Sequence, residues 1–203
     1  MDWDTTDISS LAIIDREVSN NRFSPAEYEI IRRVIYRTGD FEYYSLLKFS
    51  ESALRQGTVA LSAYTSIIVD IPAIQLEIAP LLYDTFCNPV YCCSSVAVKP
   101  EPGKTKYASG LKVLAQRYPE GIYLIGQEET AFATLIDLIR KEIIQPSLVI
   151  VTAPLFSGQN NRKWLRNSSI PYICLKKRKG GANVAISIIE GLIDLAWCDR
   201  NNL

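Results

Sequence analysis

The 203-residue chain contains no histidine. Histidine is the side chain whose ordinary pKa lies near neutrality, so its absence excludes Ser–His and Cys–His nucleophile pairs and zinc sites with histidine ligands. The chain also lacks a Walker A sequence, a Gly-x-Gly-x-x-Gly fingerprint and a Gly-x-Ser-x-Gly elbow. If a proton is moved near neutral pH, another side chain must move it.

Long apolar runs and an excess of charge are also missing. No window of 18 apolar residues occurs, which predicts that the chain does not span a membrane. Lys+Arg and Asp+Glu number 22 each, a balance that argues against nucleic acid or an anionic membrane surface as partner. The acidic start, "MDWDTTDISSLAIID", lacks the positive region of a signal peptide, so we expect a cytoplasmic protein.

Cysteine is present but in no metal-binding pattern. The five cysteines stand at positions 87, 92, 93, 174 and 198, and "CNPVYCC" has a spacing found in neither zinc nor iron–sulfur sites. Buried, reduced thiols are the simplest interpretation. We expect no metal site.

Apolar runs alternate with amphipathic segments over the last two-thirds of the chain. The runs, typical of buried parallel strands, lie at 66–71, 90–93, 122–126, 148–152 and 172–175. Helical patterns occupy 106–118, 130–141, 161–166 and 182–197. This order predicts an α/β fold: a single domain, 1–203, with a doubly wound, mostly parallel five-stranded sheet and helices on both faces.

The first 65 residues predict a helical segment instead. Apolar residues at helical spacing predict a helix over 8–18. In "RFSPAEYEIIRRVIYRTGD", Ser24 caps a second helix, Pro25 begins it, Glu27 completes a capping box and Gly39 ends it. A third is expected from Ser50 to Gly57, and a short fourth follows in "TVALSAY".

Ligands of such open sheets bind outside the carboxyl ends of the strands. The segments expected there are Asp70, "GQEET" (126–130), "TAPLFSG" (152–158) and "KKRKGG" (176–181). In the last, four cations precede two glycines and a helix start, an arrangement suited to a polyanion. A solvated basic turn is the alternative, and both interpretations stay open.

Six segments, in this order, resemble the precorrin-8X methylmutase (precorrin isomerase) family. They are "RFSPAEYEIIRRVIYRTGDFEY", "FSESALRQGTVAL", "IIVDIPAI", "YLIGQEETAFATLIDLI", "PSLVIVTAPLF" and "KRKGGANVA", spread over most of the chain. The resemblance implies an isomerase of cobalamin (corrin) biosynthesis. The reaction moves a methyl group from C11 to C12 of precorrin-8X or cobalt-precorrin-8, giving hydrogenobyrinate or cobyrinate. It also implies a homodimer with the site near the subunit interface, and no separate cofactor.

The resemblance also assigns site residues. The positions that match the family directly are Ser10, Arg33, Asp70, Thr130, Gly180 and Gly181, all implied to bind substrate. Lys106 stands where the family has an arginine, and Leu155-Phe156 where it has Gly-Phe. Arg178 and Lys179 are expected to bind the carboxylates of the tetrapyrrole substrate.

Tyr36 stands where the family's proposed proton donor, a histidine, is usual. A tyrosine titrates near pH 10, so at neutral pH it donates a hydrogen bond but gives up its proton less readily. Arg32 and Arg33, one helical turn back, could lower that pKa. We therefore predict a catalytic Tyr36, with a packed aromatic as the alternative. Two other functions stay open: a corrinoid- or tetrapyrrole-binding paralogue without isomerase activity, and a structural or regulatory module.

Overall fold

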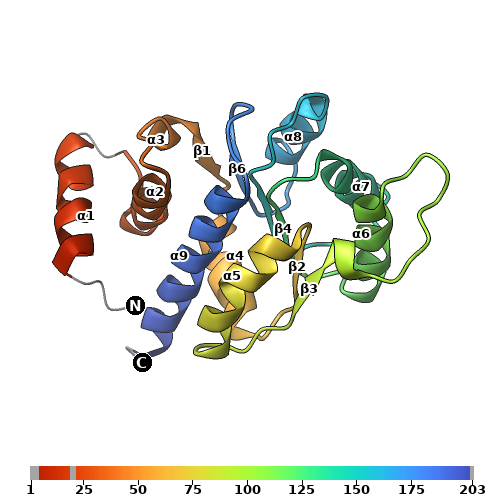
Figure 1. Ribbon diagram of the computed structural model, residues 1–203, viewed down its shortest axis with the longest axis horizontal. Coiled ribbons are helices and arrows are strands. Elements are labelled where there is room, and N and C mark those ends of the chain that lie inside the picture. The colour runs from red at the N-terminus through yellow and green to blue at the C-terminus, as the bar shows by residue number, and fades with distance from the viewer. Residues whose placement is uncertain (1–4, 19–21, 202–203) are drawn as a thin grey trace.

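The computed structural model describes residues 5–18 and 22–201, and they form one six-stranded sheet flanked by helices (Figure 1). The strands are β1 (Leu47–Phe49), β2 (Ile67–Val69), β3 (Val90–Cys92), β4 (Ile122–Ile125), β5 (Leu148–Val151) and β6 (Tyr172–Leu175). Their order is β1-β6-β5-β4-β2-β3, and every pair is parallel except β1 with β6. The predicted α/β class and mostly parallel sheet are confirmed.

The prediction of five strands was one too few. β1 is only three residues long and pairs antiparallel with β6 at the edge of the sheet, with Lys48 opposite Cys174. Such a short edge strand with a central lysine produces no apolar run, so the pattern of buried strands does not reveal it.

Helices cover both faces of the sheet. They are α1 (Thr5–Glu17), α2 (Pro25–Thr38), α3 (Tyr43–Leu46), α4 (Ala53–Ser62), α5 (Pro72–Tyr83), α6 (Lys106–Arg117), α7 (Glu129–Arg140), α8 (Gln159–Arg166) and α9 (Ala182–Asn201), with a 3₁₀ turn at Cys93–Ser95. One buried cluster joins α4, α5 and α9 to the sheet, and another joins α6, α7 and α8 to its other face. Figure 1 shows α2 outside α9 and α1 outermost. Within the described ranges, no helix has the length and apolar character needed to cross a membrane.

The strands divide their side chains between these two clusters. In β2, Ile67 and Val69 enter the first cluster and Ile68 enters the second, because successive strand residues point to opposite faces. All three are fully buried. Burial on both sides explains why the parallel strands appear in the sequence as continuous apolar runs.

The cap signals of α2 are confirmed. Ser24 accepts a hydrogen bond from the Glu27 N–H, the Glu27 carboxylate accepts one from the Ser24 N–H, and Gly39 ends the helix at φ 65°. The prediction for the next segment was wrong, because α4 continues through Gly57 to Ser62. Gly57 is an interior contact: a Cβ there would lie 3.0 Å from Leu148 Cδ2.

Candidate functional site at the carboxyl edge of the sheet

Asp70 lies at the topological switch point between β2 and β4. The chain runs from β2 to β3 on one side and then returns to β4 on the other, which opens a crevice where ligands commonly bind. The Asp70 carboxylate, fully buried, accepts N–H bonds from Gly126 (3.1 Å), Gln127 (2.7 Å) and Glu128 (2.7 Å). Burial raises the pKa of Asp70, and the three amide donors offset part of that rise. The side chain thus fastens β2 to the start of α7.

Thr130 and Lys106 lie together at the starts of α7 and α6. The hydroxyls of Thr130 and Thr105 are 2.7 Å apart, and Thr105 also caps α6 by accepting the Ala108 N–H at 3.1 Å. Lys106 is the first residue of α6, and it is exposed, as is Thr130. This pair of exposed polar groups lies at the edge where the sequence placed them.

Gly180 and Gly181 connect the loop after β6 to the end of β5. The Gly181 N–H donates to the Thr152 carbonyl (2.8 Å), and the Thr152 hydroxyl donates to the Gly181 carbonyl (2.9 Å). A Cβ on Gly180, whose φ is 155°, would lie 2.0 Å from the Thr152 carbonyl oxygen. Glycine at 180 therefore lets the loop after β6 lie close to the backbone of Thr152. A Cβ on Gly181 would meet no atom within 4 Å.

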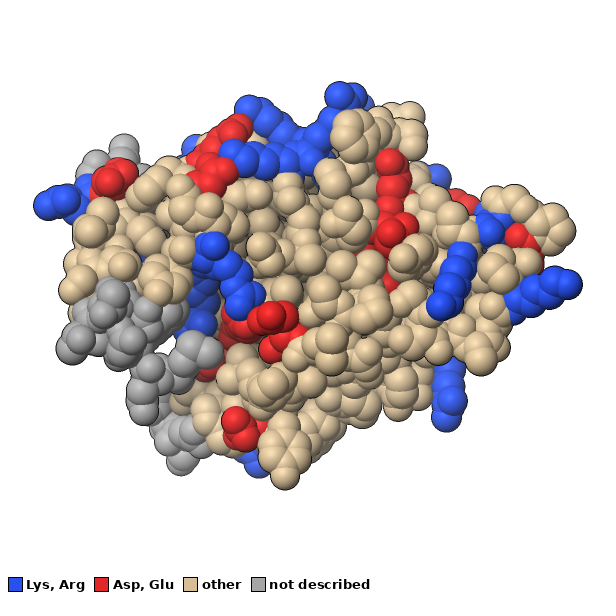
Figure 2. Space-filling model, in the orientation of Figure 1, with Lys and Arg blue, Asp and Glu red and all other residues tan. Residues whose placement is uncertain are grey.

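The basic loop is partly neutralised by the segment after α2. Lys177 and Lys179 each place Nζ 2.9 Å from a carboxylate oxygen of Glu42, and Lys179 also pairs with Asp40. These hydrogen bonds lower the pKa of Glu42 and raise that of Lys179. Figure 2 shows basic and acidic side chains side by side at the upper edge, over α3 and the loop that follows β6. The pairs join the end of α2 to this loop.

Arg178 makes a different contact from its neighbours. Its guanidinium lies 5.6 Å from the centre of the Phe156 ring, in the loop between β5 and α8. Phe156 is one of the most exposed large apolar side chains, at 69%. Arg178 forms no ion pair with a carboxylate of the described residues, so of the two predicted cations it is the one with charge available to a ligand.

Tyr36 lies in the last turn of α2, with 38% of its surface exposed. The next residue, Arg37, reaches Glu190 on α9 (3.4 Å) and Glu77 on α5 (3.6 Å). Arg37 thus joins the end of α2 to α5 and α9, and Tyr36 lies in the same turn of the helix.

The arginines expected to influence Tyr36 have carboxylate partners. Arg33 is 7% exposed, and its Nη2 lies 2.6 Å from the Asp194 carboxylate on α9. Arg32 pairs with Asp15 on α1 at 3.2 Å and also with Glu29. Their charge is thus largely balanced by carboxylates. Ser10, the remaining predicted residue, is half-buried on α1.

Glu129 is a functional candidate that sequence reasoning missed. Its carboxylate accepts N–H bonds from Phe156 (3.1 Å), Ser157 (2.7 Å) and Gly158, and the Ser157 hydroxyl at 2.8 Å. Partial burial raises its pKa, but these donors outweigh burial and hold the pKa below its usual value. Glu129 thereby fixes the loop that carries Phe156, and its partners, 27 to 29 residues away, leave no local signal.

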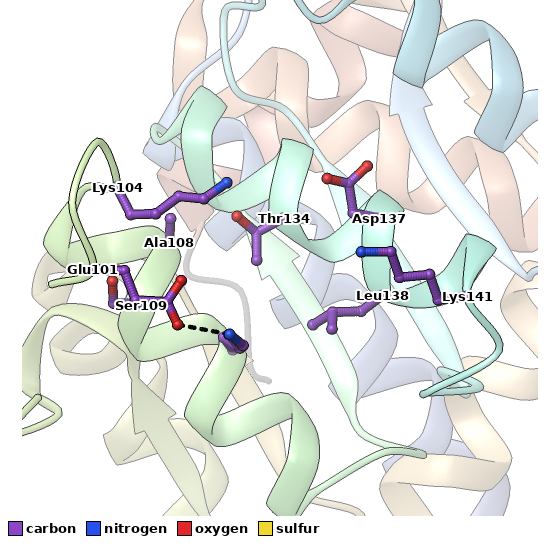
Figure 3. A pocket seen from close by; sticks show the side chains of 9 residues that line it. Glu101, Lys104, Ala108, Ser109, Thr134, Asp137, Leu138 and Lys141 are labelled. Atoms are coloured by element: carbon purple, nitrogen blue, oxygen red, sulfur yellow. Dashed lines mark hydrogen bonds and ion pairs between the residues drawn. The ribbon is translucent and has the colours of Figure 1, made fainter.

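The predicted residues that follow the strands lie at an open edge of the sheet, whereas Ser10, Arg33 and Tyr36 lie on α1 and α2. Five cavities of about 180 to 630 Å³ open on the surface, and none of these five is lined by a predicted site residue. Figure 3 shows one of about 210 Å³ between α6 and α7, where Lys112 pairs with Glu101. In the described part of the chain, no group of three or more Cys, Asp or Glu side chains could hold a metal ion.

Three comparisons with known proteins agree. The family model described as precorrin-8X methylmutase matches residues 7–195. The chain is 34% identical to the cobalt-precorrin-8 methylmutase of a Synechocystis strain over 94% of each chain, and 31% identical to that of Methanocaldococcus jannaschii over 87% of this chain and 83% of the relative. A crystal structure of the precorrin-8x methyl mutase from Thermus thermophilus superposes with a TM-score of 0.85 at 29% identity, covering 96% of both chains.

Proposed function

The chain belongs to the precorrin-8X methylmutase family and is an isomerase of cobalamin biosynthesis, and we propose that its reaction takes place at the carboxyl edge of the sheet. The observation that carries this location is that four segments are linked there in two pairs. Glu42 joins the end of α2 to the basic loop, and Glu129 joins the start of α7 to the loop before α8. A site assembled from so many segments needs such cross-links to hold its geometry.

The proposed reaction moves a methyl group from C11 to C12 of the tetrapyrrole. We favour cobalt-precorrin-8 over precorrin-8X as the substrate. The relatives at 30 to 34% identity are named cobalt-precorrin-8 methylmutase, whereas the precorrin-8x methyl mutase of Thermus thermophilus is 29% identical and two relatives named precorrin-8X methylmutase are 25% identical. The cobalt would belong to the substrate, and the reaction we propose requires no ligand to it from the protein.

In this proposal Tyr36 donates a proton to the ring while the methyl group migrates. Because an isomerisation leaves the composition of the substrate unchanged, the proton must return to the tyrosine before the next turnover. The half-exposed position of Tyr36 at a helix end lets its hydroxyl reach a ligand on the surface. Positioned acid catalysis of this kind contributes roughly 10²- to 10⁴-fold in rate.

The carboxylate arms of the substrate would be held around the ring. We assign this role to the guanidinium of Arg178, the ammonium of Lys106, the hydroxyl of Thr130 and the open backbone at Gly181. Figure 2 shows a field of uncharged side chains in the middle of this view, with basic and acidic groups at the upper edge and on both sides of that field. A macrocycle with peripheral carboxylates has the same distribution of polarity.

The other predicted residues would act mainly by supporting these contacts. Asp70 and Arg33 are buried and engaged by the protein, so we propose that they position α7 and α2. Lys179 would hold the basic loop through Asp40, and Gly180 would allow its close approach to β5. Ser10 stays a proposed substrate contact on α1.

We also propose a homodimer that covers the open edge. Leu11, Ile14 and Leu46, on α1 and α3, are buried within the protomer and give no apolar surface to a partner. The outward face of α5 is a candidate, since Leu76 and Tyr83 are 72% and 80% exposed on a helix whose one charged residue is Glu77. We further propose that 1–203 is one domain, because both buried clusters share one sheet. We expect the protein to act in the cytoplasm and to bind no nucleic acid.

Incubation of the purified protein with cobalt-precorrin-8, and separately with precorrin-8X, tests the function. We expect the absorbance to change to that of the corrin chromophore, faster with the cobalt form. A spectral shift on binding without conversion would instead favour the corrinoid-binding paralogue. No response to either tetrapyrrole would leave only the structural or regulatory module.

A further inference from the structure

A groove of about 400 Å³ beside α8 has an unusual concentration of positive charge. Its lining residues are Gln159, Asn160, Arg162, Lys163, Arg166, Asn167 and Lys176. Four of the seven are cations and none is a carboxylate, although the chain as a whole has equal numbers of each. Figure 1 shows α8 beside the end of β6, next to the loop that carries Arg178.

Arg162 is the buried member of this groove. It is 2% exposed, its Nη1 donates to the Lys177 carbonyl (2.6 Å) and its Nη2 to the Ala153 carbonyl (3.1 Å). Its Nε is buried without an acceptor, and the guanidinium forms no ion pair with a carboxylate in the described ranges. A buried cation without an anion is costly, and each unsatisfied buried donor calls for a partner. Oxygen atoms of a bound anion would supply both.

The opposite side of the groove crowds like charges together. Lys176 and Arg166, which both line the groove, act through their charge on Lys48 of β1. Burial and these neighbouring cations lower the pKa of Lys48. An anion between the two walls would relieve this repulsion.

We propose that the groove between α8 and the end of β6 binds a small oxyanion, either a phosphate or a carboxylate. Arg166 and Lys163 supply charge at its mouth, and the amides of Asn160 and Asn167 supply further donors. Arg162 also holds the ends of β5 and β6 through the two carbonyls, so bound anion would stiffen the loop that carries Arg178. This site is separate from the residues assigned to the ring.

Nuclear magnetic resonance of the arginine Nε–H groups gives a direct test. Inorganic phosphate is titrated into the ¹⁵N-labelled full chain, with sodium chloride adjusted to hold ionic strength constant. We expect the Arg162 Nε–H signal, assigned by its loss in Arg162→Lys, to shift and saturate. In Lys163→Gln/Arg166→Gln the apparent Kd should rise about tenfold or more.

The matched control is Lys104→Gln/Lys141→Gln, which removes the same charge from the cavity of Figure 3. Its Kd should equal that of the wild type. A shift that never saturates, or an equal loss of affinity in both double variants, would overturn the proposal. Adding the corrin product then separates the sources: displacement of phosphate means that the groove receives a carboxylate arm of the corrin, and undisturbed phosphate means a separate anion.

Discussion

The Asp70 carboxylate accepts the backbone N–H of Gln127 at 2.7 Å, a bond that spans 57 residues and closes the switch point of the sheet. Asp70→Asn would turn an NH₂ group towards amides that can only donate. We expect the free energy of unfolding to fall by about 2–4 kcal/mol, measured by urea denaturation at pH 7. The control is Asp84→Asn, at the exposed end of α5. Equal free energies of unfolding for Asp70→Asn and Asp84→Asn would contradict the structural role of Asp70.

Glu129 predicts a pH dependence of stability. Because its pKa is lower in the folded protein, its contribution is complete above the unfolded pKa near 4.3 and is lost as the pH falls through the folded pKa. We expect Glu129→Gln to be less stable than the wild type at pH 7, and the difference to shrink as the pH falls below the unfolded pKa. The measurement is urea unfolding across that range.

The neighbouring Glu128 is the control for this prediction, because its shift has the opposite sign. Burial and the Asp70 charge raise the pKa of Glu128, so its ionised form opposes folding above the unfolded pKa. Glu128→Gln should therefore leave stability unchanged or raise it at pH 7. If Glu129→Gln and Glu128→Gln lowered the free energy of unfolding equally, neither carboxylate would act through its charge.

Much of the fold could be predicted because its signals are local. The partners within each cap of α2 lie within four residues of each other, Ser24 with Glu27 and Gly39 with Ile35. The parallel strands are apolar because both faces of the sheet are covered. β1 escaped prediction since a three-residue edge strand is specified by its pairing with β6. Gly57 resembled a helix end, but its role is set by Leu148 and Leu192, which only the packed protein brings near.

The candidate site could be predicted as a set of segments but not as a network of contacts. The rule that ligands bind at the carboxyl ends of parallel strands marked the segments to examine. It could not reveal that Glu42 neutralises Lys179, 137 residues away, because docking of α2 against α9 determines that pair. The same limit hid Glu129. Cations that appear available in a sequence can therefore be occupied in the fold.

The proposed dimer predicts an effect of charge on α5. Leu76→Asp would place a carboxylate in the apolar face, so the mass from light scattering should fall from about twice 22.8 kDa to one chain. Turnover should fall with it if the partner covers the edge. Val59→Asp, on α4 and 59% exposed, is the matched control and should stay dimeric. A wild-type mass of 22.8 kDa at micromolar concentration would contradict the dimer.

The basic loop predicts unequal roles for adjacent cations. Arg178→Ala should weaken binding of the corrin product by about 1.5–3 kcal/mol, as expected for a lost charged hydrogen bond. Lys179→Ala should weaken it less, because Asp40 and Glu42 already engage that ammonium. Calorimetric titration of both variants measures the difference. Unchanged affinity in both, with the fold intact, would make 176–181 a solvated turn.

Variants of Tyr36 test whether its hydroxyl donates the proton during the methyl shift, since the chain has no histidine. Tyr36→Phe removes only the hydroxyl, and the ring is partly exposed, so melting temperature and corrinoid affinity should change little. Turnover should fall by about 10²- to 10⁴-fold if the hydroxyl is the acid. Tyr36→His should match or exceed the wild type and acquire a dependence on pH between about 5 and 8. Equal turnover of the wild type and Tyr36→Phe would leave Tyr36 as packing, with the rate due to positioning of the substrate alone.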